Sequence, residues 1–190
     1  VRRVLLITFV SEFVGMVLLT IAFLVSTEMR FWEALWQGFF HSVSAFCNAG
    51  FDPFGFANSI EEYMTDPAIN LIIMALITLG GMGFSVILDV VRHRRFRKLM
   101  LHSRIVLLMS GALFLSGTIL TALVEWNNPN TLAQPGVNPL EKIMAAAFQS
   151  VTVRTAGFDT IGQGDLTPAG LMVAIIHMFI GASPASTGGG

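Results

Sequence analysis

Four apolar segments of bilayer length dominate this sequence: Val4–Val25, Ile69–Val91, Ile105–Val124 and a last one that starts near Leu166. A helix of about 20 mostly apolar residues is long enough to cross the hydrocarbon core of a bilayer. The chain is 54% hydrophobic and only 12% charged, whereas soluble domains carry roughly 25% charged residues. We therefore expect an all-α, multi-pass membrane protein.

Two shorter apolar segments, Phe31–Cys47 and Leu140–Val153, lie between these expected spans. Runs of this length are too short to cross a bilayer and are typical of re-entrant elements. The order along the chain is then span, half-span, loop and span, and this order occurs twice. A parallel repeat of this kind suits assembly around an axis normal to the membrane.

The basic residues are concentrated at two points of the chain. Eight of the eleven are Arg2, Arg3, Arg92, Arg94, Arg95, Arg97, Lys98 and Arg104. Basic residues beside a span mark the cytoplasmic side, and both clusters fall on that side only if the half-spans re-enter. The acidic loops expected on the opposite side suit either a mouth that attracts cations or ordinary solvated loops.

The tetrapeptide Ala-Gly-Phe-Asp occurs at Ala49–Asp52 and again at Ala156–Asp159, each time directly after a half-span. Glycine allows backbone conformations that other residues avoid, and backbone carbonyls aimed at an axis can replace the hydration shell of a cation. The phenylalanine can pack behind such a bend. This pattern predicts two parts of an ion-selective pore, whereas the simpler alternative is a pair of turn glycines after short helices.

The stretch Gly181–Gly190 follows the last apolar segment and carries no charge. Its glycines and Pro184 oppose a regular helix. Two interpretations remain open from the residues alone. The stretch is either a flexible intramembrane loop that gates the pore below the filter or an exposed flexible tail.

Several ionisable residues need separate interpretation. Arg154 precedes the second bend, and we expect it to point away from the ion path and to pair with Asp159. Asp89 is expected to pair with Arg92 or a neighbour. Glu12 lies inside the first span, where an ionisable group is a functional candidate by default, although a bond to a neighbouring helix is an equal alternative.

The remaining features argue against other classes of function. His41 and His177 lie in helical runs without metal-ligand partners, so packing is the expected role. Gly80–Gly83 interrupts the second span, for close helix packing or as a hinge. The single Cys47 excludes an internal disulfide. The chain has no nucleophile–base set, no phosphate loop and no basic face for nucleic acid, so we expect neither an enzyme nor a nucleic-acid partner.

The run Ser44–Asp52 resembles the second filter of the Trk/Ktr/HKT potassium transporter superfamily, and Thr152–Phe158 resembles its third filter. Phe179–Gly190 resembles the interrupted helix that follows the third filter. The pattern is most similar to that of the Ktr-type membrane, or pore-forming, subunit of bacteria. The resemblance implies helix–pore–helix units of potassium-channel-like fold, four per chain, arranged pseudo-fourfold around a central pore.

This chain then corresponds to an internal fragment with the second and third units, at residues 1–91 and 105–190, joined by a basic cytoplasmic link at 92–104. The implied filter residues are Asn48, Ala49, Gly50, Phe51, Thr155, Ala156, Gly157 and Phe158, with potassium at the carbonyls of Gly50 and Gly157. The implied gate comprises Gly181, Ala182, Ser183, Pro184, Ala185, Ser186, Thr187, Gly188, Gly189 and Gly190.

The resemblance also implies partners. It implies a homodimer in the bacterial inner (plasma) membrane, seated on a cytosolic RCK-type regulatory ring that binds ATP or ADP and controls the gate. Potassium is the implied substrate, with sodium as an activator in many members and no organic cofactor in this chain. Two alternatives stay open: an alternating-access solute or cation carrier, and a membrane assembly subunit that transports nothing.

Overall fold

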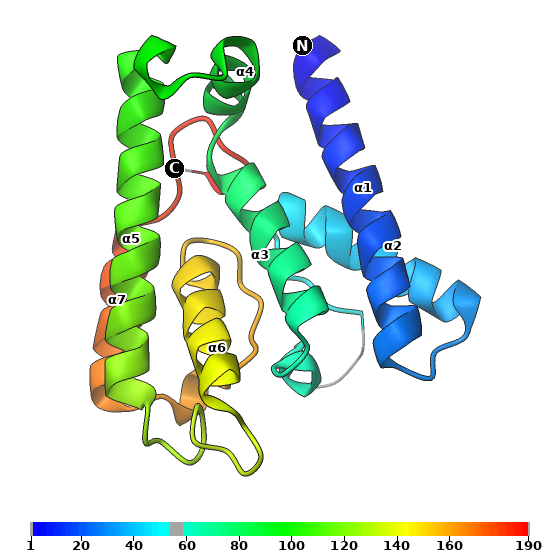
Figure 1. Ribbon diagram of the computed structural model, residues 1–190, viewed down its shortest axis with the longest axis vertical. Coiled ribbons are helices and arrows are strands. Elements are labelled where there is room, and N and C mark those ends of the chain that lie inside the picture. Colours follow the sequence, from blue (N-terminus) through cyan, green and yellow to red (C-terminus); the bar gives the residue numbers. More distant parts are fainter. Residues whose placement is uncertain (1, 54–58, 190) are drawn as a thin grey trace.

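The computed structural model describes residues 2–53 and 59–189, and within these ranges the chain is helical and contains no strand. Short 3-10 turns at Glu61–Tyr63, Phe96–Lys98 and Gln163–Asp165 lie in the connections. The α-helices, shown in Figure 1, are in chain order α1 (Arg2–Ser26), α2 (Phe31–Phe46), α3 (Pro67–Gly81), α4 (Phe84–His93), α5 (Leu101–Glu125), α6 (Pro139–Thr152) and α7 (Pro168–Ile180). The expected all-α class is confirmed.

Helices α1 and α5 have 25 residues each and are long and apolar enough to cross a membrane. The expected span Ile69–Val91 is not one straight helix, because α3 and α4 differ in direction by 99° at a short break. Gly83 has φ +88° in this break, a backbone conformation that glycine adopts without strain. The described residues thus contain two candidate spans, or three if the bent pair counts as one.

The last expected span is shorter than a bilayer requires. Helix α7 has 13 residues and is followed by Gly181, whose φ is +67°. The chain then continues without helix through residue 189. Gly190, the last residue of the expected gate, lies outside the described residues.

The two half-spans form the short helices α2 and α6. Both begin at the end of the molecule where α1 and α5 finish, and both stop near its middle (Figure 1). Each begins with the same local arrangement: the Arg30 N–H donates to the Glu33 carboxylate at 3.1 Å, and the Asn138 N–H donates to Glu141 at 2.7 Å. These acidic side chains satisfy backbone donors at the helix start. The two short helices thus share both their starting end in Figure 1 and their capping arrangement.

A matching contact fixes each short helix against its long neighbour. Ser42 of α2 donates to the Glu12 carbonyl of α1 at 2.6 Å, and Ser150 of α6 donates to the Phe114 carbonyl of α5 at 3.0 Å. A glycine lies three residues after each carbonyl, and a side chain there would meet the serine hydroxyl. Small residues let helices approach closely, so Gly15 and Gly117 create the space for both contacts.

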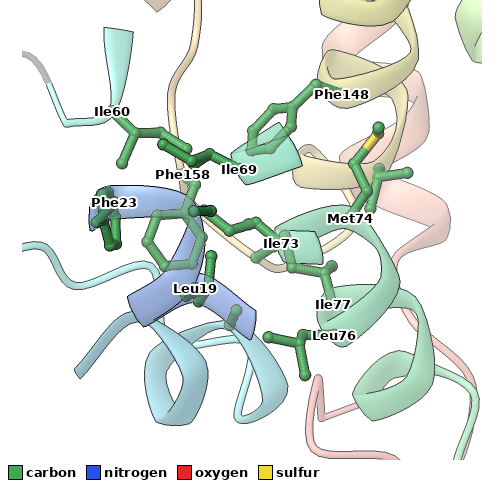
Figure 2. Close-up of a cluster of buried hydrophobic side chains, with 14 of the residues drawn as sticks. Leu19, Phe23, Ile60, Ile69, Ile73, Met74, Leu76, Ile77, Phe148 and Phe158 are labelled. Carbon is green, nitrogen blue, oxygen red and sulfur yellow. The ribbon is translucent and has the colours of Figure 1, made fainter. Parts of the chain in front are cut away.

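The largest buried cluster lies between α1, α3 and α6 (Figure 2). Leu19 and Phe23 of α1 face Ile69 and Ile73 of α3, and Phe158, from the loop after α6, fills the space between them. Lipid tails are as apolar as these side chains, so close packing rather than water exclusion holds such a cluster together in a membrane. The cluster ties the second bend to the helices of the first half of the chain.

Candidate functional site

The two Ala-Gly-Phe-Asp bends meet in the middle of the molecule. Gly50 has φ +68° and Gly157 has φ +83°. A Cβ atom added to Gly50 would meet the Ala156 carbonyl oxygen and lie 2.8 Å from Gly157 Cα, and one added to Gly157 would lie 3.5 Å from Gly50 Cα. The structure thus brings together the two glycines that the repeat singled out.

Each bend contains a second residue with positive φ. Asn48 has φ +51° and Thr155 has φ +71°, and each is separated from its glycine by an alanine. A non-glycine residue in this region costs roughly 1–3 kcal/mol and persists only where the surroundings hold it. The shared conformation of the two bends is therefore imposed by their surroundings.

Hydroxyl groups at equivalent positions hold the two bends. The Ser44 hydroxyl contacts both the N–H and the carbonyl of Phe51, each at 2.9 Å, and the Thr152 hydroxyl donates to the Phe158 carbonyl at 2.5 Å. The short helices α2 and α6 thereby hold the carbonyls of both phenylalanines. The sequence interpretation missed these hydroxyls, although the matched Ser44 and Thr152 of the two copies were a visible signal.

The two phenylalanines have different surroundings. Phe158 is fully buried in the core cluster and stacks on His41 with ring centroids 6.0 Å apart. Phe51 leaves 69% of its surface exposed. The expected packing behind the bend thus occurs in the second copy and not in the first within the described residues.

The segment 181–189 lies against the ends of α2 and α3. The Ser183 N–H donates to the Gly81 carbonyl at 3.1 Å, and the Thr187 N–H donates to the Gly80 carbonyl at 3.3 Å. The Thr187 hydroxyl donates to the Phe46 carbonyl, the last of α2, at 2.8 Å. The described part of the segment is thus bonded next to the first bend. The sequence interpretation did not identify Thr187 as the residue that holds it.

Arg154 connects the other end of this segment to α5. Its Nε donates to the Gly181 carbonyl and its Nη2 donates to the Ser110 hydroxyl, both at 3.3 Å. The predicted ion pair with Asp159 is wrong, because the Asp159 carboxylate instead accepts a hydrogen bond from Gln163 at 2.8 Å. A cavity of about 20 Å³, lined in part by Asn48 and Arg154, lies beside these contacts and has room for about one water molecule.

Carboxylates gather beside the second bend. Burial, together with the negative charges of Asp159 and Asp165, raises the pKa of Glu61. Burial also raises the pKa of Asp159, against the opposing hydrogen bond from Gln163. Within residues 2–53 and 59–189, no group of three or more His, Cys, Asp and Glu side chains could hold a metal ion. This region is negatively charged but forms no such metal site.

Of the other singled-out residues, His41 lies beside both bends, because its ring stacks on Phe158 and its Nε2 lies 3.7 Å from the Asp52 carboxylate. The buried His41 and His177 each bond through Nδ1 to a carbonyl of their own helix, at 2.9 Å, as packing roles predict. The Glu12 carboxylate lies 3.8 Å from the Cys47 sulfur. Gly80 packs closely against the Phe46 carbonyl, and Gly83 forms the bend between α3 and α4. Both expected roles of these glycines therefore occur.

The whole chain, residues 1–190, matches the family model described as TrkH, cation transport protein. The chain belongs to the TrkH family. It is 38% identical over 192 residues to the Ktr system potassium uptake protein B of Vibrio alginolyticus, an alignment that covers 100% of this chain and 41% of that protein. It is 35% identical over 181 residues to the potassium/sodium uptake protein NtpJ of Enterococcus hirae, and this alignment covers 95% of this chain and 39% of that protein.

The TrkH match confirms the resemblance drawn from the two filter runs and the interrupted helix. A homologue from Bacillus subtilis (strain 168), also named Ktr system potassium uptake protein B, is 38% identical over 160 residues, which is 83% of this chain and 35% of that protein. The chain therefore spans about two fifths of the length of these curated relatives. The TrkH family is one of ion transporters, not enzymes. The apolar helices of this chain are those of a multi-pass plasma membrane protein.

Proposed function

We propose that this chain contributes two filter-bearing units to a potassium uptake pathway across the bacterial plasma membrane. The observation that carries the proposal is the meeting of Gly50 and Gly157, each in a bend at the inner end of a short helix. In this proposal the two bends, whose glycines both have positive φ, aim backbone carbonyls at a shared ion path, the way in which a dehydrated cation is coordinated. The relatives named as potassium uptake proteins supply the choice of cation.

The filter then consists of the residues from Asn48 to Phe51 and from Thr155 to Phe158. The carbonyls of Phe51 and Phe158 are bonded to hydroxyls of their own units, so the carbonyls of the preceding residues, above all Gly50 and Gly157, are the proposed potassium ligands. The exposed Phe51 suits a bend that packs against a further unit, as Phe158 packs against the first half of this chain.

The units are proposed as residues 1–91 and 105–190, two of a pseudo-fourfold set around one pore, in a membrane subunit that forms homodimers. The segment 181–190 is proposed as the gate, controlled by a cytosolic RCK-type ring that binds ATP or ADP. Support for the gate comes from the described residues 181–189, which are bonded to the ends of α2 and α3 next to the first bend. Sodium is proposed as an activator, in line with the relative named a potassium/sodium uptake protein.

The test is rubidium uptake in cells that lack other potassium uptake systems, with the full-length protein. We expect Gly50→Ser and Gly157→Ser to weaken the preference for potassium over sodium and to raise the potassium concentration needed for growth. Gly111→Ser is the matched control, because this glycine has open space around it and lacks a positive φ. Wild-type selectivity in both filter variants would contradict the assignment and favour an assembly role.

An alternating-access carrier is the second candidate, since α7 stops at Gly181 and the chain continues as a broken helix, a feature of carrier binding sites. The measured turnover number separates the two. A pore passes many ions per conformational change, whereas a carrier binds and releases its substrate once per cycle.

A further inference from the structure

An apolar groove opens between the start of α1 and helix α4. It has a volume of about 320 Å³ and is lined by Leu6, Ile7, Leu88 and Val91, with Arg3 and Arg92 beside them. Both elements lie at the end of the molecule opposite the starts of α2 and α6 (Figure 1). Ligand pockets in proteins have volumes of roughly 300–1,000 Å³, so the groove is large enough for part of an elongated apolar molecule.

Helix α4 runs across the direction of the long helices. It turns by 99° from the direction of α3, and Figure 1 shows it nearly end-on while α1 and α5 run along the long axis of the molecule. Its sequence is mostly apolar, contains the buried Asp89 and ends with the basic residues Arg92 and His93. A short helix of this kind lies in the interface, with its apolar side toward the acyl chains.

The two arginines at the groove are available to an anion. Asp89, expected as a partner of Arg92, instead accepts hydrogen bonds from His93 Nδ1 and from the Met100 N–H, both at 2.8 Å. In the part of the chain that the structure describes, the side chains of Arg3 and Arg92 make neither a hydrogen bond nor an ion pair. Two guanidinium groups from separate elements thus border one apolar groove without a counter-charge.

We propose that this groove binds an anionic phospholipid of the cytoplasmic leaflet. One acyl chain lies along Leu6, Ile7, Leu88 and Val91, and the headgroup phosphate bonds to Arg3 and Arg92. Guanidinium groups bind phosphate oxygens through paired hydrogen bonds, and basic pockets between membrane helices on the cytoplasmic side bind anionic headgroups. The proposal concerns a lipid site apart from the bends. It rests on the topology in which the N-terminal arginines face the cytoplasm.

The test is native mass spectrometry of the purified full-length protein titrated with phosphatidylglycerol or with zwitterionic phosphatidylcholine. We expect phosphatidylglycerol to bind more tightly. Because each basic residue near an anionic lipid contributes about fivefold in affinity, the double variant Arg3→Gln/Arg92→Gln should lose about thirtyfold. The matched control is Arg95→Gln/Arg97→Gln, which removes the same charge from exposed positions outside the groove and should weaken this binding much less.

A second variant tests the apolar part of the site without a change of charge. Val91 is 61% exposed, so Val91→Trp can fill the groove without disturbing the core and should also weaken phosphatidylglycerol binding. Equal losses in both arginine double variants, or equal affinity for the two lipids, would show attraction to general surface charge and overturn the proposal. Unchanged binding in Val91→Trp would overturn it too. Rubidium uptake is not the readout, so these outcomes are independent of the proposed transport function.

Discussion

The two filter glycines have unequal surroundings, which predicts unequal effects of the same substitution. A methyl group on Gly50 meets the Ala156 carbonyl, whereas one on Gly157 has its nearest neighbour, Gly50 Cα, at 3.5 Å. Both positions have positive φ, so alanine costs roughly 1–3 kcal/mol at either. We expect Gly50→Ala to lower the thermal unfolding midpoint in detergent, and rubidium uptake, more than Gly157→Ala does. The reverse order would show that the bends do not meet as described.

A pH dependence follows from Glu61. Its folded-state pKa is raised by burial and by the charges of Asp159 and Asp165, so the folded protein favours the protonated form. The stability associated with this group is present below its ordinary pKa and is lost as the pH rises through the raised pKa. Glu61→Gln should therefore raise the unfolding midpoint at neutral pH and leave it unchanged in acid. The exposed neighbour Glu62 provides the control variant Glu62→Gln, and equal pH profiles for both would contradict the prediction.

For individual residues, the sequence predicted the backbone bends, which depend on local residue type, and missed the side-chain contacts, which depend on distant partners. The bends at Gly50 and Gly157 could be predicted because an identical tetrapeptide after a short helix takes the same conformation twice. The partner of Arg154 could not, because Gly181 and Ser110 lie far away in the sequence. Phe51 and Phe158 occupy the same position in the repeated tetrapeptide. They differ in burial, because Phe158 packs against α1 and α3 whereas Phe51 is exposed.

Among the elements, the segment 181–189 is held in place by individual hydrogen bonds to its neighbours. The Thr187 hydroxyl bonds to the last carbonyl of α2, and such a bond contributes about 0.5–1.5 kcal/mol. Thr187→Val should therefore shift the segment away from α2 and raise rubidium flux about two- to tenfold. Thr118→Val is the control, because that hydroxyl bonds to a carbonyl of its own helix α5. An unchanged flux in Thr187→Val would count against the gate.

The position of the break between α3 and α4 could be predicted from the sequence, but its angle could not. The glycines of Gly80–Gly83 marked the position of an interruption, and hydropathy marked the apolar residues on both sides. The 99° change of direction depends on how α4 packs against α5 and on the buried Asp89, which bonds to the Met100 N–H. Those contacts join residues that no local pattern connects.

For the whole molecule, the re-entrant topology gives the last prediction. Glu28 lies between α1 and α2, Lys98 between α4 and α5, and Asn127 between α5 and α6, and all three side chains are exposed. If α2 and α6 re-enter, Glu28 and Asn127 are outside and Lys98 is in the cytoplasm, as the basic link requires. A full crossing by α2 would instead put Glu28 and Lys98 outside and Asn127 inside.

Single cysteines in a Cys47→Ser background, labelled on intact cells with a membrane-impermeant maleimide, distinguish these arrangements. We expect Glu28→Cys and Asn127→Cys to be labelled and Lys98→Cys to be labelled only after the membrane is permeabilised. The three positions form an internal control, because any continuous crossing by α2 reverses Lys98 and Asn127 together. Such a reversal would show that α2 crosses the membrane completely, and it would contradict the re-entrant topology in which both bends lie at the inner ends of short helices.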